Sequence, residues 1–226
     1  MVLNINLINM KVIFTISLII LFLVGNNTYA QKRKFRPLIG TQHEKNSDVY
    51  GLSLGFYPTQ SNYKNLNRTY GVRLEIFPLS FLYFLASKVP EIQEVNHKIY
   101  GINLSTGTFQ GIDIYGISTT LFMNNIKHSN GISLAGLTNS IEKGNGIMIA
   151  FGGNGIKKGN GIMISGPYGG YSENFNGIQI SFENYSTKIN GIQIGLFNKT
   201  KNLKGIQIGL WNKNKKRTLP FINWNF

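Results

Sequence analysis

Three side chains at regular spacing are the first candidates for chemistry. Glu91, Glu94 and His97 follow one another at intervals of three residues, so a helix would carry all three on one face. Glu94-Val-Asn-His97 also has the Glu-x-x-His spacing with which one helix of a di-iron bundle binds metal. Such a centre needs a second copy of the motif and further carboxylates, and the sequence contains neither. We therefore interpret these residues as a solvated polar face.

Glycine clusters are the second candidate. Gly-Asn-Gly occurs at 144–146 and at 159–161, and glycine-rich loops can cradle phosphate groups. The Gly-x-x-x-x-Gly-Lys-Ser/Thr pattern of a phosphate-binding loop is absent from the chain. The chain also has no Cys, which excludes thiolate metal sites and cysteine nucleophiles. We predict no catalytic, cofactor-binding or metal-binding residue, and a protein that is not an enzyme.

The glycines instead mark an internal repeat. A Gly-Ile pair recurs at spacings of 14 to 16 residues, at Gly101, Gly116, Gly131, Gly146, Gly161, Gly177, Gly191 and Gly205. Earlier copies begin at Gly51 and Gly71, and the copies become more alike toward the C-terminus. We assign a structural role in the repeat to Gly131, Gly146, Gly161, Gly177, Gly191 and Gly205.

Within each unit the apolar residues alternate with polar or small ones, which is the pattern of a β-strand. In the unit from Gly191, one face carries Ile192, Ile194 and Leu196, and the other carries Gln193, Gly195 and Phe197. Stretches rich in Lys, Asn and Gly separate the alternating runs and indicate turns. The sequence therefore predicts an all-β repeat protein of about 10 to 12 short strands.

Two architectures fit this repeat. We favour an antiparallel meander, which could close into a barrel with its apolar face toward lipid. The alternative is a parallel β-solenoid with 14 to 16 residues per coil, in which the isoleucines stack inside and asparagine ladders form at the corners. The solenoid is the less favoured because the polar half of a unit, residues 199–204, has one apolar residue, Leu203, to line a core. The closing strand, Leu219–Phe226, alternates in aromatic residues as the final strand of an outer-membrane barrel does.

The ends of the chain set the predicted domain boundaries. Residues 1–30 have a lone Lys11, an apolar run over 12–24 and a small residue at Ala30, the pattern of a secretory signal peptide. That apolar run is shorter than the roughly 20 residues of a membrane-spanning helix. Residues 31–226 then form a single β-repeat domain with regular repeats over 101–218. An irregular insertion over 77–99 would be a strand pair or a short helix that begins after Pro90.

The chain is strongly basic, with 23 Lys and Arg against 9 Asp and Glu and a net charge of +14. The candidate anion-binding residues of the last units are Lys199, Lys201, Lys204, Lys213, Lys215, Lys216 and Arg217. Such a patch attracts anionic polymers, and an exported chain meets outer-membrane lipid and anionic glycan rather than a specific nucleic acid. The alternative is that these side chains only solubilise the sheet and discourage pairing at its edges.

The C-terminal half, over 130–226, resembles the exported surface-repeat proteins of the Bacteroidetes, with relatives among leptospiral surface-repeat lipoproteins. The stretches that carry this resemblance are Asn190–Asn198, Leu203–Asn212 and the closing Leu219–Phe226. The chain lacks the Cys that anchors the lipoproteins. The resemblance implies a non-catalytic envelope protein and transfers no site residues.

We therefore expect an exported, non-enzymatic β-repeat protein of the envelope, associated with the outer membrane or inserted in it. The alternative is a soluble module, secreted or periplasmic, that binds anionic glycan or lipid.

Overall fold

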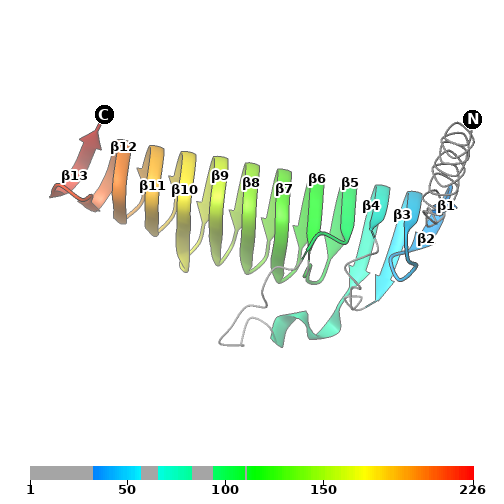
Figure 1. The fold of residues 1–226 in the computed structure, drawn as a ribbon. Coiled ribbons are helices and arrows are strands. Elements are labelled where there is room, and N and C mark those ends of the chain that lie inside the picture. Colours follow the sequence, from blue (N-terminus) through cyan, green and yellow to red (C-terminus); the bar gives the residue numbers. More distant parts are fainter. Residues whose placement is uncertain (1–32, 57–65, 83–93, 110) are drawn as a thin grey trace, which may run out of the picture. The chain divides into compact units, whose positions relative to one another are not determined.

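The computed structural model describes residues 33–56, 66–82, 94–109 and 111–226, which form one 13-stranded sheet with a single short 3-10 helix, η1 (Figure 1). The predicted signal peptide, residues 1–30, and Pro90 of the insertion lie outside the described residues. The elements are β1 (Lys34–Arg36), β2 (Ile39–Thr41), β3 (Ser47–Phe56), β4 (Asn67–Ile76), η1 (Pro78–Phe81), β5 (His97–Ser105), β6 (Ile112–Thr120), β7 (Met123–Ala135), β8 (Thr138–Ala150), β9 (Gly153–Ser165), β10 (Gly169–Ile180), β11 (Glu183–Ile194), β12 (Phe197–Lys213) and β13 (Thr218–Asn225).

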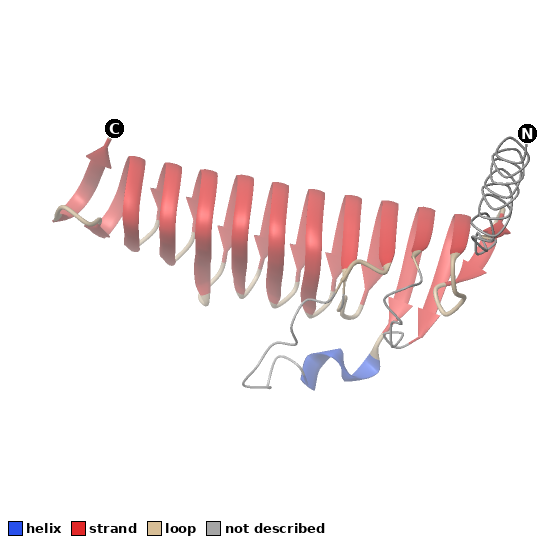
Figure 2. Ribbon diagram, in the orientation of Figure 1, coloured by secondary structure: helices blue, strands red, loops and turns tan. Residues whose placement is uncertain are grey.

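The strands form a parallel β-solenoid. From β3 to β12 each strand pairs in parallel with the next one along the chain, so each repeat unit is one coil (Figure 2). Only β13 is antiparallel, and it closes the C-terminal end against β12. The all-β repeat prediction is confirmed. The antiparallel meander and its closure into a barrel are wrong, and the parallel solenoid kept as the alternative is the observed fold.

Each coil bends at its repeat glycine. The glycines stack in register from Gly51 to Gly205, and their φ angles lie between 121° and 145°. A side chain at Gly161 would place its Cβ 2.0 Å from the carbonyl oxygen of Gly146 in the preceding coil. Both the backbone angle and this close approach require glycine. The regular spacing of glycine is thus the spacing of a bend that no other residue fits.

The inward and outward faces of each unit are the reverse of those we assigned to the solenoid. Gln193 is fully buried, whereas Ile194 beside it is 38% exposed. The buried glutamines bond along the solenoid, because Gln193 Nε2 donates to Gln179 Oε1 at 2.8 Å and Gln207 Nε2 donates to Gln193 Oε1 at 2.8 Å. A buried amide with its hydrogen bonds made in this way does not carry the desolvation penalty of an unpaired one.

The polar half of each coil also lines the core. Asn139 Nδ2 donates to Asn154 Oδ1 at 2.8 Å, and Asn184 repeats this bond to Asn198 at 2.9 Å. Apolar residues fill the space between these ladders; they are Ile99, Ile112, Ile114, Ile126, Ile141, Met148, Ile156, Met163, Phe175, Ile189 and Leu203. The core that appeared too thin in the sequence is completed by amides that bond to their own copies in the next coil.

Candidate functional site

The most unusual surface of the solenoid is the apolar face, which we define by the side chains one and three positions after each repeat glycine in β3 to β12. These are Leu52, Leu54, Val72, Leu74, Ile102, Leu104, Ile117, Thr119, Ile132, Leu134, Ile147, Ile149, Ile162, Ile164, Ile178, Ile180, Ile192, Ile194, Ile206 and Ile208. Nineteen of these 20 are aliphatic, and the remaining one is Thr119. None of the 20 side chains is charged, and all of them are half-buried or exposed.

The apolar face is large. Ten parallel strands about 4.8 Å apart extend over about 43 Å, and two rows of side chains cover a width of about 14 Å, which gives roughly 600 Å². A third row, five positions after the glycine, adds Phe56, Ile76, Leu121, Phe151, Phe182, Leu196 and Leu210. β13 extends the face further, because Ile222 and Trp224 lie opposite Ile208 and Ile206. Soluble monomers rarely expose a continuous apolar patch of this size, and such patches mark interaction surfaces.

Tyrosine or a polar side chain borders the apolar face at the position before each repeat glycine. In the N-terminal coils this position holds Tyr50, Tyr70, Tyr100 and Tyr115, which stack with ring centroids 4.7 to 5.0 Å apart and interplanar angles of 8° to 11°. In the following coils the same position holds a ladder of hydrogen-bonded asparagines at 2.7 to 2.9 Å, formed by Asn130, Asn145, Asn160 and Asn176. The apolar face therefore ends abruptly in polar groups.

Lysines lie just beyond this border. Lys143 and Lys158 pair in register two positions before the asparagine ladder, and Lys188 continues the row after Asn174. All three lysines are exposed. A row of positive charge thus runs parallel to the apolar face and is separated from it by the asparagines.

The seven candidate anion-binding residues gather at the C-terminal end of the solenoid. Lys199, Lys201, Lys204 and Lys213 lie on β12, and residues 215–217 lie in the turn before β13. Some of this charge is engaged locally. Lys216 Nζ donates to Asn225 Oδ1 at 2.7 Å, and the Arg217 guanidinium lies over the Trp224 ring at 4.7 Å. None of the seven belongs to the apolar face.

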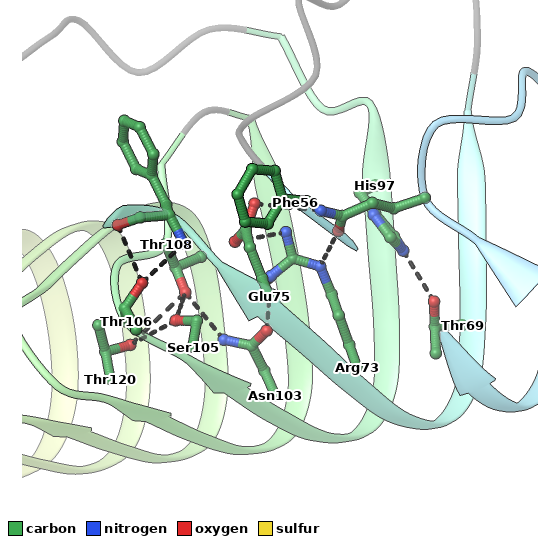
Figure 3. A network of polar contacts seen from close by, with 12 residues as sticks. Phe56, Thr69, Arg73, Glu75, His97, Asn103, Ser105, Thr106, Thr108 and Thr120 are labelled. Atoms are coloured by element: carbon green, nitrogen blue, oxygen red, sulfur yellow. Dashed lines mark hydrogen bonds and ion pairs between the residues drawn. The ribbon is translucent and has the colours of Figure 1, made fainter. Parts of the chain in front are cut away.

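A buried polar network occupies the N-terminal coils (Figure 3). The Arg73 and Glu75 side chains form an ion pair at 2.7 Å while only 3% and 1% exposed. Arg73 also donates to Gln42 Oε1 at 2.6 Å and to Asn103 Oδ1 at 2.7 Å. This arrangement satisfies a guanidinium in the interior, where an unpaired charge would be costly. The network links side chains of successive coils, and it offers no exposed reactive group.

His97 belongs to the same buried region and not to a polar face. Its ring Nε2 forms a hydrogen bond with Thr69 Oγ1 at 2.8 Å. Burial, aided by the positive charge of Arg73, lowers the pKa of His97 well below its usual value, so the ring is neutral. The solvated helical face expected over these residues is therefore wrong at His97. Glu94 pairs with Lys127 at 3.5 Å, and Glu91 lies outside the described residues. Among the described residues, no group of three His, Asp or Glu side chains could hold a metal ion.

The Gly-Asn-Gly triplets lie within β8 and β9, where they form the bend of a coil and not a phosphate-binding loop. Part of the predicted insertion is described: η1, with Pro78 at its start, packs near the apolar cluster of Phe77, Phe109 and Met123. No helix in the described part of the chain is long and apolar enough to cross a membrane.

Comparison of the chain with protein-family models, with curated proteins and with solved structures finds no match. The resemblance to surface-repeat proteins therefore stays a prediction, and the function has to be argued from the surfaces of the solenoid itself.

Proposed function

We propose that this chain is a non-enzymatic, exported envelope protein that lies on the surface of the outer membrane with its apolar face against the lipid. The single observation that carries the proposal is the apolar face itself, with 19 aliphatic side chains at 20 outward positions in ten coils. Where one face of a sheet meets water, that face is normally the polar one and the inward face is apolar. In these strands the outward side chains are aliphatic, while the inward side chain two positions after the repeat glycine is polar in eight of the ten coils, Met148 and Met163 being the two exceptions. Contact with lipid accounts for that inversion.

The borders of the apolar face support this orientation. Tyrosine is enriched where membrane meets water, because its ring is apolar and its hydroxyl is polar, and Tyr50, Tyr70, Tyr100 and Tyr115 lie at such a boundary. Lysines beside an apolar surface add attraction to anionic lipid of about 1 kcal/mol for each cation near the headgroups. The net charge of +14 favours an anionic surface over a second copy of the same basic chain.

The energy available is ample for reversible binding. At about 25 cal/mol per Å², removing roughly 600 Å² of apolar surface from water contributes about 15 kcal/mol before costs. Immobilising the protein on the surface costs at least about 4 kcal/mol, and partial immersion reduces the gain further. A net favourable energy remains, and it is spread over many equivalent side chains, so the loss of one or two weakens binding without abolishing it.

The test compares two double variants on the same strands. Ile180→Thr with Ile208→Thr removes apolar area from β10 and β12 while it keeps β-branched side chains, which strands favour. Asn174→Thr with Asn202→Thr makes neutral changes at exposed positions of the same two strands, outside the apolar face. The residues 31–226 chain and both variants are mixed with vesicles of phosphatidylglycerol and phosphatidylcholine and separated by flotation.

The expected loss follows from the exposed area. Each Ile→Thr change removes about two carbons, whose transfer from water to lipid would contribute about 1.6 kcal/mol if they were fully exposed before binding. Ile180 and Ile208 are 37% and 42% exposed, so the contribution of each is reduced in proportion. Two such changes cost about 1.3 kcal/mol, so the partition coefficient should fall about tenfold, whereas the asparagine variant should match the native chain. A native chain that stays at the bottom of the gradient, or an isoleucine variant that floats as well as the asparagine variant, would contradict the proposal.

A second candidate function rests on the lysine cluster. We propose as the alternative that a soluble form binds anionic glycan through Lys199, Lys201, Lys204 and the 213–217 segment, where residues 199–217 contain no acidic residue. Such binding should weaken steeply between 50 mM and 500 mM salt, because exposed charges are screened within about 10 Å at 0.1 M. Retention on heparin resin that does not change with salt would count against this candidate.

A further inference from the structure

A shallow groove crosses the polar side of the solenoid, in the half of each coil that precedes the repeat glycine. It has a volume of about 310 Å³ and is lined by residues of four successive strands, β8 to β11. Four strands extend over about 14 Å, so an occupant would have to be extended along the solenoid axis. The volume lies at the lower end of the range typical of ligand sites.

The groove exists because of one missing side chain. Ser140, Gly155, Tyr171 and Tyr185 occupy the same register position in the four strands. A Cβ added at Gly155 would meet only the carbonyl oxygen of Asn139, at 3.9 Å, so the space above this glycine is open. Gly155 differs in this respect from the repeat glycines, where a Cβ would clash with the backbone. Because Gly155 has no side chain, its backbone forms the floor of the groove.

One end of the groove is aromatic. The rings of Tyr171 and Tyr185 lie 6.3 Å apart at an interplanar angle of 43°, and Lys199 Nζ lies 5.7 Å from the Tyr185 ring centroid on the far side. Tyr171 is exposed, so part of its ring can stack with an occupant. Burial, and to a lesser extent the carboxylate of Glu183, raise the pKa of Tyr171, and its hydroxyl is, like any tyrosine hydroxyl, a hydrogen-bond donor at neutral pH.

The remaining lining residues include charged side chains of both signs, which supply both hydrogen-bond donors and acceptors. Glu142, Lys157 and Glu173 line the groove, and none of the three forms an ion pair or a hydrogen bond with another side chain of the described residues. With Lys199 at the aromatic end, these groups amount to two carboxylates and two ammonium groups, so the groove has no net charge that would select an anionic ligand. They suit the hydroxyl groups of an uncharged molecule, which both donate and accept hydrogen bonds.

We propose that this groove binds a neutral, linear β-1,4-linked hexopyranose chain. Such a chain is extended, presents flat C–H faces that stack on tyrosine, and carries hydroxyl groups along both edges. Its sugar rings follow one another at a distance close to the spacing of adjacent strands, so successive rings lie over successive coils, with every second ring in the same orientation. The groove is on the opposite half of the coil from the apolar face, so one molecule could hold lipid and glycan together.

The proposal is tested by titration calorimetry of the residues 31–226 chain with cellohexaose, with chitohexaose and with polygalacturonate as an anionic comparison. Gly155→Val fills the floor of the groove with a residue that strands favour, and Tyr171→Ser removes the stacking ring. Tyr115→Ser is the matched control, because this tyrosine lies in the stacked row that borders the apolar face. Circular dichroism melting curves confirm that each variant is folded.

At least one neutral hexasaccharide should bind, and its affinity should fall at least tenfold in Gly155→Val and in Tyr171→Ser but not in Tyr115→Ser. The proposal is overturned if neither neutral hexasaccharide binds at millimolar concentration, if only polygalacturonate binds, or if the two groove variants bind as the native chain does. The vesicle flotation of Gly155→Val should equal that of the native chain, so the outcome here is independent of the proposed membrane association.

Discussion

Introducing a glutamate at each of two neighbouring positions in turn gives a sharp test of which side of the strand is inside. We expect Gln193→Glu to destabilise the chain severely and Ile194→Glu to have little effect. Gln193 is fully buried, donates to Gln179 and accepts from Gln207, whereas Ile194 is 38% exposed on the apolar face. Hydrophobicity alone would place the isoleucine inside and the glutamine outside. It therefore predicts that Ile194→Glu destabilises the chain more than Gln193→Glu does.

The size of the effect follows from the contacts. Gln193→Glu removes the Nε2 donor, so a carboxylate oxygen faces the Gln179 oxygen where a 2.8 Å hydrogen bond had been. An uncompensated buried charge costs about 3 to 5 kcal/mol, a large part of a typical total stability of 5 to 15 kcal/mol. Ile194→Glu is an exposed change, for which the cost in a strand is about 1 kcal/mol or less.

Urea unfolding followed by circular dichroism measures both. With a slope of about 2 kcal/mol per molar urea, the midpoint of Gln193→Glu should fall by about 2 M and that of Ile194→Glu by at most about 0.5 M. Burial raises the pKa of the introduced carboxyl above the unfolded value of about 4.3. Its penalty is therefore full above the folded-state pKa, shrinks as pH falls through that pKa, and is gone below the unfolded value. The deficit of Gln193→Glu should therefore be smaller at pH 4 than at pH 8. A larger midpoint loss for Ile194→Glu than for Gln193→Glu would refute the reasoning.

Three further predictions concern other parts of the solenoid. Gly161→Ala should lower the free energy of unfolding by about 3 kcal/mol or more, because φ is 124° there and the new Cβ would lie 2.0 Å from a carbonyl oxygen. Gly155→Ala should be neutral or slightly stabilising, because the space above this glycine is open. Thermal melting curves compare the two variants. Arg73→Met should cost about 3 to 5 kcal/mol because it leaves Glu75 charged and buried, and adding Glu75→Leu should restore most of the loss in urea unfolding; a double variant no better than the single one would contradict this. The buried, neutral His97 has a lowered pKa, so the unfolded chain takes up a proton that the folded chain does not as pH falls below about 6.5. Stability should therefore drop between pH 7 and pH 5, and less so in His97→Gln.

The existence and period of the repeat were predictable from the sequence, because the bend of each coil requires glycine and the glycines therefore recur at the repeat spacing. Gly51 and Gly71 were correctly included in the pattern, and they stack in register with Gly101. Strand direction was not predictable in the same way. Alternation of period two is common to parallel and antiparallel strands. The meander is favoured from the sequence because a 14-residue coil is small and residues 199–204 look too polar to line a core.

The orientation of the faces could not be predicted from hydrophobicity, because the structure places its amides inside. Gln193 and Asn184 are tolerable in the interior only because each stacks on an equivalent amide one coil away. That partner is 14 residues distant in the sequence and becomes a neighbour only once the strands are parallel. The near identity of Gly191-Ile-Gln-Ile and Gly205-Ile-Gln-Ile was the available signal, since like residues can form such ladders.

The candidate surfaces were predictable to different degrees. The lysines and Arg217 of the last units do lie together, as sequence proximity suggests, while the groove at Gly155 depends on register between four strands and had no signal in the sequence. The solvated helical face expected at Glu94 and His97 is wrong because a strand, and not a helix, begins at His97 and places this side chain in the core.

The absence of Cys allows the most direct test of the proposal that the apolar face lies against lipid, because a single introduced Cys carries a label at one defined site. Ile164→Cys places the label on the apolar face and Lys157→Cys places it on the polar side of the same strand, β9. Each labelled chain is bound to vesicles of phosphatidylglycerol and phosphatidylcholine, and its fluorescence is quenched from lipid by brominated acyl chains and from water by iodide. We predict lipid quenching and iodide protection at position 164 and the reverse at position 157. Equal iodide quenching at both positions on bound protein would contradict the account.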